Sequence, residues 1–259
     1  MSERASAVPA HYLADKVAVV TGGRGGIGHA ICARFVREGA TVYCADIAGS
    51  RSHGFGIDVD LDVTSEDSVD ALFEQIGTDH GQLDILVNAA GVEIEKTIED
   101  TSLAEWNHVM AVNVTGMFLT SRRAVALMRK AGAGSIINFG SYDGFIADPQ
   151  LAVYCASKGA VHALTRAMAC DHGPENIRVN AVCPGYVNTP MLQSFFGNSG
   201  DIASLEKAVR DVHPIQRYGE PEDIANMVNW LAGHEARYAS GQLFIIDGGL
   251  SAQVQQMKL

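Results

Sequence analysis

The stretch VAVVTGGRGGIG at residues 17–28 decides the fold of this 259-residue chain. Its first five residues are apolar or β-branched and predict a buried strand. The glycines allow the backbone to turn sharply, and the pattern from Ile27 to Arg37 predicts a helix. A glycine-rich turn between a strand and a helix N-terminus offers amide N–H groups to a phosphate. The stretch therefore predicts the start of a dinucleotide-binding fold.

Six further β-branched runs follow, and helical patterns separate most of them. These runs are residues 41–46, 57–62, 85–88, 135–141, 178–183 and 243–246. Strands that alternate with helices predict a parallel sheet covered on both faces. We therefore expect one α/β domain, a doubly wound seven-stranded Rossmann fold over residues 15–259, preceded by a flexible arm at residues 1–14. Only ten residues separate Asp46 from Ile57, which predicts a turn or one helical turn there rather than a full helix.

The composition and net charge of the chain indicate which class of molecule it binds. The net charge is −11, with 19 basic and 30 acidic residues, which does not favour nucleic acid or anionic lipid. Five dispersed cysteines without a CxxC spacing indicate neither a disulfide framework nor a metal site. No apolar run is long enough for a signal peptide or a membrane span. We expect a cytoplasmic protein that binds a small molecule.

The end of the second predicted strand bears on the choice of nucleotide. Asp46 lies about 20 residues beyond the glycine turn, where a carboxylate accepts hydrogen bonds from the adenosine ribose and repels a 2′-phosphate. Arg24 in the turn favours the opposite choice, because a guanidinium can pair with that phosphate. On balance the sequence predicts NAD, with NADP as the less favoured cofactor.

Tyr154 and Lys158 are one helical turn apart in the run Tyr154-Cys155-Ala156-Ser157-Lys158. Residues i and i+4 share a helix face, so the ammonium can stabilise a phenolate. A separation of roughly 4 Å at an effective dielectric constant of about 20 gives about 4 kcal/mol, which lowers a tyrosine pKa by up to ~3 units. The pair predicts a general acid/base that works near neutral pH.

Taken together, these motifs resemble the short-chain dehydrogenase/reductase family of NAD(P)-dependent oxidoreductases, over about residues 16–249. The matching elements, in order, are Thr21-Gly22 with Gly26 and Gly28, Asp62-Val63, Asn88-Ala89-Ala90-Gly91, Asn113, Ser141, Tyr154 with Lys158, and Pro184-Gly185 with Thr189. The glycine turn and the resemblance together assign cofactor binding to Gly22, Arg24, Gly26, Ile27, Gly28, Asp46, Asp62, Val63, Asn88, Ala89, Gly91, Tyr154, Lys158, Pro184, Gly185, Val187 and Thr189. For Asn88 the larger role implied is structural support of the sheet.

The resemblance also implies a catalytic set of Asn113, Ser141, Tyr154 and Lys158. Ser141 would orient a substrate hydroxyl, Tyr154 would take its proton, and hydride would pass to the nicotinamide. Lys158 would lower the tyrosine pKa and bind the nicotinamide ribose. Asn113 would lie in a kinked helix whose carbonyl holds a water chain to solvent. The predicted reaction interconverts a secondary alcohol, including cyclic alcohols and polyols, and its ketone.

Substrate specificity is expected from residues 92–96, 142–153 and 186–196, the last of which opens a long loop at about residues 186–218. Apolar and ring-bearing side chains there favour a ring-containing substrate, whereas the polar ones could bind hydroxyl groups of a polyol. The predicted substrate-binding residues are Glu93, Tyr142, Asp143, Gln150, Tyr186, Met191 and Phe195. The sequence does not determine the substrate, its stereochemistry or the direction of reaction.

Two rival functions remain open. An NADP-dependent 3-oxoacyl-[acyl-carrier-protein] reductase shares the same four residues, and a local basic cluster of Arg122, Arg123, Arg129 and Lys130 could bind an acidic carrier protein. A non-catalytic dinucleotide-binding sensor is a more remote alternative. The resemblance further implies a homo-oligomer, a tetramer or a dimer, joined through helices at about residues 103–128 and 152–171.

Overall fold

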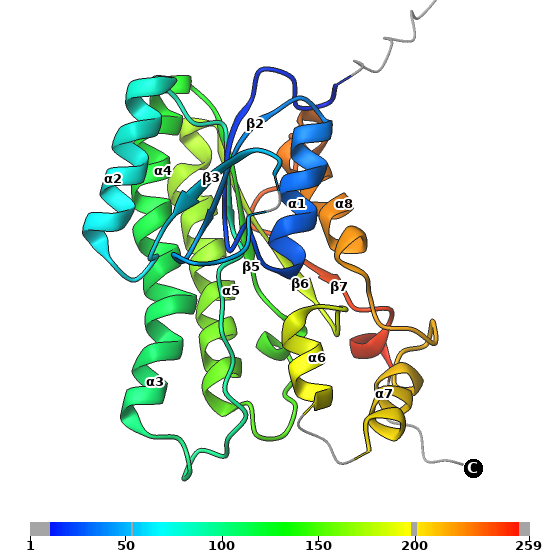
Figure 1. Ribbon diagram of the computed structural model, residues 1–259. Coiled ribbons are helices and arrows are strands. Elements are labelled where there is room, and N and C mark those ends of the chain that lie inside the picture. Colours follow the sequence, from blue (N-terminus) through cyan, green and yellow to red (C-terminus); the bar gives the residue numbers. More distant parts are fainter. Residues whose placement is uncertain (1–10, 53, 198–200, 254–259) are drawn as a thin grey trace, which may run out of the picture.

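The computed structural model describes residues 11–52, 54–197 and 201–253. Its centre is a seven-stranded parallel sheet of order β3-β2-β1-β4-β5-β6-β7, as the sequence predicts (Figure 1). The strands are β1 Val17–Thr21, β2 Thr41–Asp46, β3 Ile57–Asp60, β4 Ile85–Asn88, β5 Gly134–Phe139, β6 Ile177–Pro184 and β7 Leu243–Ile246. Two strands are shorter than predicted at their carboxyl ends, since β3 stops at Asp60 and β5 at Phe139. Ser141 therefore lies in the turn beyond β5.

Helices cover both faces of the sheet. They are α1 Gly26–Arg37, α2 Glu66–Asp79, α3 Leu103–Met110, α4 Met117–Ala131, α5 Ala152–His172, α6 Pro190–Gly197, α7 Ile202–Asp211 and α8 Pro221–Ala232. Figure 1 shows α2, α4 and α5 on one face and α1 with α8 on the other. This is the doubly wound arrangement, in which each crossover returns the chain to the end of the sheet where the strands begin, so that successive strands run parallel.

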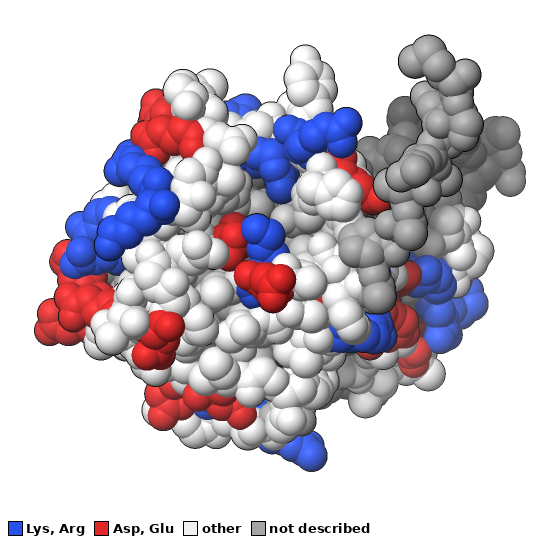
Figure 2. Space-filling view, turned by 90° about the horizontal axis from the view of Figure 1, so that it is seen from above, with Lys and Arg blue, Asp and Glu red and all other residues white. Residues whose placement is uncertain are grey.

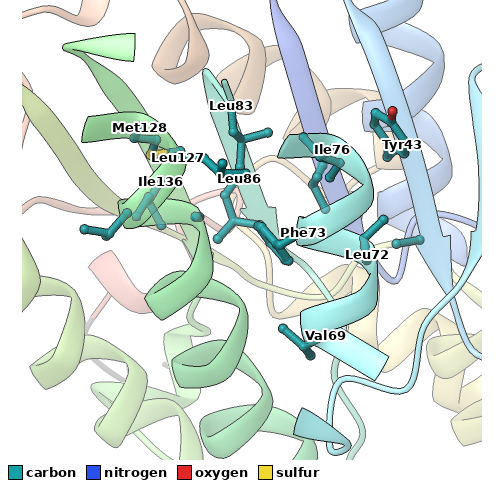
Figure 3. Packing of buried hydrophobic residues seen from close by; sticks show 14 of the residues in the cluster. Tyr43, Val69, Leu72, Phe73, Ile76, Leu83, Leu86, Leu127, Met128 and Ile136 are labelled. Carbon is teal, nitrogen blue, oxygen red and sulfur yellow. The ribbon is translucent and has the colours of Figure 1, made fainter. Parts of the chain in front are cut away.

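Successive side chains of a strand point to opposite faces of the sheet, so the protein has a hydrophobic core on each face. Side chains at Val19, Leu86 and Ile136 pack toward α2, α4 and α5, whereas their neighbours Val20 and Ile85 pack toward α1 and α8. Figure 3 shows the first core, where side chains of α2 and α4 meet those of β4 and β5. Strands buried on both faces explain why their sequences are continuously apolar.

The interval between β2 and β3 holds no helix among its described residues. Gly49, Gly54 and Gly56 there have φ values of +85°, +77° and +74°. These left-handed conformations suit glycine, and they turn the chain back to pair β3 with β2 in parallel register. The predicted turn is confirmed.

The helix predicted at residues 103–128 is not continuous. A π-helical segment, Ala111–Gly116, separates α3 from α4. It contains Asn113, which is 3% exposed. Single π-helical turns inside α-helices occur frequently at functional sites, because the extra residue redirects the side chains.

The two irregular regions predicted from the sequence carry more structure than expected. The arm is described only from residue 11 onward, and there Leu13 is 1% exposed and donates its backbone N–H to Glu38. The packed chain therefore begins before residue 15. Two helices, α6 and α7, lie in the loop at residues 186–218, of which residues 198–200 are outside the described part.

Within the described residues, no helix is both long and apolar enough to cross a membrane. The same residues hold no cluster of His, Cys, Asp or Glu side chains arranged to bind a metal ion. Figure 2 shows the end of the molecule away from α6 and α7, where basic and acidic side chains are interspersed.

Candidate active site

A cavity of about 440 Å³ lies at the carboxyl end of the sheet. Its walls come from the segments that follow β4, β5 and β6, together with the first turns of α5 and α6. The carboxyl edge of an open parallel sheet is the usual place for a ligand, because the loops there diverge. Predicted residues that line the cavity are Ile27, Ala89, Gly91, Glu93, Ser141, Tyr142, Asp143, Gln150, Tyr154, Lys158, Pro184, Gly185, Tyr186, Val187, Thr189, Met191 and Phe195.

The glycine turn adjoins this cavity through α1. Gly22 has φ +66°, and a Cβ atom on Gly28 would lie 2.1 Å from the carbonyl oxygen of Gly22. A Cβ atom on Gly26 would lie 2.8 Å from the methyl group of Thr189, so the loop after β6 packs on the start of α1. Only glycine fits this close packing, and the resulting cradle at a helix N-terminus suits a pyrophosphate.

Asp46 faces the same turn. Its carboxylate accepts hydrogen bonds from the Arg24 backbone N–H at 3.0 Å and the Ser50 hydroxyl at 3.1 Å. The Arg24 guanidinium turns away toward β3, where it donates to Asp60 at 2.8 Å and to the Ser50 carbonyl oxygen at 3.3 Å. Asp58 lies 3.6 Å from the same guanidinium, and the Arg24 side chain is only 6% exposed. Protein carboxylates thus already neutralise the charge that could have bound a 2′-phosphate.

Asp62 and Val63 lie beyond β3, outside the cavity. The Asp62 carboxylate accepts from the Thr64 N–H at 2.9 Å and the Thr64 hydroxyl at 2.7 Å. Val63 packs against Gly116, where a Cβ atom would come within 2.8 Å of the valine side chain. This contact holds the π-helical segment against the strand end.

Asn88 is fully engaged inside the protein. Its amide nitrogen donates to Asn138 at 2.9 Å and to Ser121 at 3.1 Å, and its oxygen accepts from Thr120 at 2.7 Å. The side chain is 5% exposed. Asn88 therefore ties β4 to β5 and α4, and any effect on a cofactor is indirect.

Asn113 holds the chain beyond β4. Its side-chain oxygen accepts from the Val92 N–H at 2.9 Å, and its nitrogen donates to the Val92 carbonyl oxygen at 2.9 Å. The same nitrogen donates to Ser157 at 3.0 Å. Because these bonds link the π-helical segment to both the cavity wall and α5, Asn113 fixes the position of Glu93 relative to Tyr154.

Ser141, Tyr154 and Lys158 meet in the cavity. The Lys158 ammonium lies 5.3 Å from the centre of the Tyr154 ring and donates to the Phe139 carbonyl oxygen at 2.9 Å. Burial lowers the pKa of Lys158 to about 8. The Ser141 hydroxyl donates to Asp143 at 3.1 Å, and its hydrogen bond with Tyr154 opposes the larger rise that burial causes in the pKa of Tyr154. The three side chains that the sequence singles out thus line the same cavity.

The predicted lowering of the Tyr154 pKa to near neutral is not found in the structure. Burial raises the pKa of Tyr154, and the neighbouring carboxyl groups of Glu93 and Asp143 raise it further. The prediction rests on the charge of Lys158. Desolvation and the two acidic residues that the fold brings to the same place act in the opposite direction.

Two acidic residues of the cavity were not singled out from the sequence. Asp148 accepts hydrogen bonds from the hydroxyl groups of Tyr142 and Tyr186, the latter at 2.6 Å, and so joins the segments after β5 and β6. Glu95 also lines the cavity. Both lie within the segments predicted to set specificity, but no motif distinguishes them there. Phe196, by contrast, is buried between α6 and α7 and does not line the cavity.

Comparison with known proteins agrees with this geometry. A family model described as Enoyl-(Acyl carrier protein) reductase matches residues 22–251. The 2-(S)-hydroxypropyl-CoM dehydrogenase 3 of Xanthobacter autotrophicus is 40% identical over 93% of this chain and 98% of its own length. An NADP-dependent (R)-specific alcohol dehydrogenase of Lentilactobacillus kefiri is 37% identical over 93% of this chain and 98% of its own.

Solved structures give the same result. The aldohexose dehydrogenase of Thermoplasma acidophilum superimposes with a TM-score of 0.89 at 34% identity, covering 95% of this chain and 98% of that one. Identity at this level over nearly the whole length shows common descent as well as a common fold. The chain therefore belongs to the short-chain dehydrogenase/reductase family and is an NAD(P)-dependent oxidoreductase that acts on CH–OH groups.

Proposed function

We propose that this protein oxidises a secondary alcohol to its ketone with NAD, and catalyses the reverse reduction. The observation that carries the proposal is the meeting of Ser141, Tyr154 and Lys158 in a cavity next to the glycine turn. Glycine at residue 28 lets the turn pack closely on the start of α1, since a Cβ atom there would collide with the Gly22 backbone, and a turn of this kind at a helix N-terminus suits the pyrophosphate of a dinucleotide. When bound, the nicotinamide group supplies the hydride acceptor.

Four residues of the chain would carry out the other steps of the reaction. The Ser141 hydroxyl orients the substrate oxygen, and the Tyr154 phenolate receives its proton. The buried Lys158 ammonium stabilises that phenolate and would hold the nicotinamide ribose. Asn113 keeps the wall at Val92 in place through its paired hydrogen bonds. Its backbone carbonyl would hold a water that returns the proton to solvent.

The preference for NAD rests on Asp46 and Arg24. A carboxylate at the tip of β2 would accept hydrogen bonds from the adenosine ribose. Arg24 is engaged by Asp60 and Asp58, so binding a 2′-phosphate would require it to leave two ion pairs. One relative described above is NADP-dependent, which makes the ratio of kcat/KM values for the two cofactors the deciding measurement.

The test of the function is a panel of secondary alcohols, cyclic alcohols, polyols and ketones, assayed with both cofactors. NADH formation that depends on Tyr154 would support the proposal. Binding of NADH without turnover across the whole panel would contradict it and favour a dinucleotide-binding sensor.

An acyl-carrier-protein reductase is the main rival, and the basic cluster gives it little support. Arg122 is paired with Glu66 at 2.5 Å, Arg123 with Asp70, and Arg129 with Glu175 at 2.6 Å. Basic residues that are already paired attract an acidic partner less strongly. Turnover of an acetoacetyl thioester with NADPH in preference to free alcohols would favour the rival.

The expected homo-oligomer and the cytoplasmic location stay predictions. On the helix pair that the resemblance assigns to the interface, Leu103 is 73% exposed and Phe118 is 47% exposed. Exposed apolar side chains on these helices agree with a contact between subunits. Light scattering on the purified protein would give the number of subunits.

A further inference from the structure

The walls of the active-site cavity carry an excess of negative charge. Among the described lining residues four are acidic, namely Glu93, Glu95, Asp143 and Asp148, and Lys158 is the one basic residue. The Lys158 ammonium is bonded to the Phe139 carbonyl oxygen and faces Tyr154. Lys158 therefore serves the catalytic set rather than the rest of the substrate. Lys158 is the one cation of the described lining that acts on Glu93 and Asp143, and a single positive charge leaves the four acidic side chains in excess.

Glu93 is the clearest example. Its side chain is half-buried, and within the described part of the chain no hydrogen bond or ion pair engages its carboxyl group. Burial, reinforced by Glu95 and Asp143, raises the pKa of Glu93 to about 7. Burial and Asp148 raise the pKa of Asp143 to about 6. Crowded carboxylates of this kind are unfavourable until a cation lies between them.

Aromatic rings line the same part of the cavity. Tyr142 and Tyr186 have ring centres 5.8 Å apart, and their hydroxyl groups both point to Asp148. Phe195 from α6 adds a third ring. Aromatic faces beside carboxylates form an environment that stabilises substituted ammonium groups. A simple anion is disfavoured here, and a neutral polyol would leave the carboxylate charges uncompensated.

We propose that the natural substrate is a secondary alcohol that also carries an ammonium group, with Glu93 and Asp143 facing the cation and the tyrosine rings beside it. The site is the reaction cavity itself, so this inference rests on the proposed function and specifies its substrate class. In the oxidation, the carbinol oxygen loses its proton to Tyr154. The carbinol carbon loses hydride, with its electron pair, to the oxidised nicotinamide dinucleotide. The nitrogen keeps all its bonds and its charge.

The test compares two alcohols of the same shape. (2-Hydroxypropyl)trimethylammonium and 4,4-dimethylpentan-2-ol differ in one central atom, a charged nitrogen in place of carbon. Both are assayed with the purified full-length enzyme and NAD, beside the general alcohol panel. We expect kcat/KM to be at least ~10-fold higher for the ammonium compound, since attraction to a half-buried carboxylate exceeds 1.4 kcal/mol.

Variants assign the preference to its source. Glu93→Gln keeps the size of the side chain and removes its charge, and it should reduce the preference for the ammonium compound by about 10-fold. Asp143→Asn should reduce it as well, in addition to any effect through Ser141. Glu99→Gln, on the exposed segment before α3 and outside the cavity lining, is the matched control and should leave the ratio unchanged.

The outcomes separate the two proposals. If other secondary alcohols are oxidised but the ammonium compound is no better than its neutral counterpart, the substrate class is overturned and the proposed function stands. If the preference persists undiminished in Glu93→Gln and Asp143→Asn, the assigned residues are wrong. If no alcohol or amino alcohol is oxidised with either cofactor, both proposals fail together.

Discussion

The Lys158 ammonium lies 5.3 Å from the centre of the Tyr154 ring, on the side of α5 that faces the cavity. Burial acts on the two groups in opposite directions, since it raises the pKa of Tyr154 and lowers that of Lys158 to about 8. Each charge is unfavourable alone and favourable beside the other. A phenolate at Tyr154 would therefore need the Lys158 ammonium beside it, as proton transfer from the substrate requires.

Replacing Tyr154 by phenylalanine tests this relationship directly. The Tyr154→Phe variant keeps the ring and removes the acidic proton, so we expect turnover to fall by about 10²-fold or more, the scale of general acid/base catalysis. NADH affinity, measured by fluorescence titration, should stay nearly the same because the ring still packs. Near-normal turnover in this variant would remove Tyr154 from the mechanism.

The proposed preference for NAD over NADP rests on Asp46 and can be tested by replacing it. In Asp46→Ser the carboxylate that would repel a 2′-phosphate is gone, and we expect the ratio of kcat/KM for NAD to that for NADP to fall by about 10-fold or more, a change of 1.4 kcal/mol. Asp62→Asn, which lies beyond β3 and keeps the side-chain oxygen that accepts from Thr64, is the comparison variant. A wild-type enzyme that prefers NADP would contradict the role assigned to Asp46.

The glycine turn allows no side chain at residue 28. A Cβ atom there would lie 2.1 Å from the Gly22 carbonyl oxygen, so Gly28→Ala must displace backbone. We expect loss of measurable NADH binding and a fall in unfolding free energy of about 2 kcal/mol or more, in the range of strained core substitutions. Calorimetry and nucleotide titration measure the two effects.

Gly77→Ala in α2 is the matched control for that change. Its Cβ atom would meet only the end of the Leu127 side chain, at 3.4 Å. Alanine is the better helix former, so this variant should gain about 0.5–1 kcal/mol and keep full activity. Equal losses of stability and NADH binding in Gly28→Ala and Gly77→Ala would mean that residue 28 has no particular need for glycine.

Asn113 is expected to matter first for structure. Removing its amide in Asn113→Ala leaves the Val92 N–H and carbonyl groups without their partners, and the free energy of unfolding should fall by about 2–4 kcal/mol. The exposed Asn107 of α3 provides the control, Asn107→Ala, with an expected change below about 0.5 kcal/mol. Unchanged stability in Asn113→Ala would contradict the structural role.

Stability should depend on pH through Glu93. Its pKa is raised from 4.5 to about 7 by burial, Glu95 and Asp143, although nearby Lys158 lowers it. A carboxyl group with a raised pKa stabilises the fold while protonated. That contribution is complete below about pH 4.5 and disappears as the pH rises through 7. Between pH 4.5 and 7, the melting temperature of Glu93→Gln should therefore fall less than that of the wild-type protein, by on the order of 2–4 °C. A parallel decline in both proteins would contradict the assignment.

Much of this protein could be read from the sequence because its signals are local. The apolar runs, the glycine turn and the spacing of Tyr154 and Lys158 depend on neighbours in the chain, and they predicted the parallel sheet and the end of it that carries the cavity. The place of Ser141 beside these two residues followed from the family resemblance. Strand ends were less certain, since they depend on where pairing with the next strand stops.

Tertiary structure decided the electrostatics. Arg24 could have bound a phosphate, but β3 brings Asp58 and Asp60 to it across more than 30 residues of chain. Tyr154 could have been acidic, but burial and two carboxylates from different loops raise its pKa. The sequence by itself determined the strands, the glycine turn and the spacing of Tyr154 and Lys158, because hydrophobic periodicity and helix spacing are short-range. Only the tertiary structure decided the pKa values of the cavity residues, because desolvation and Coulomb interactions act between groups that only folding brings together.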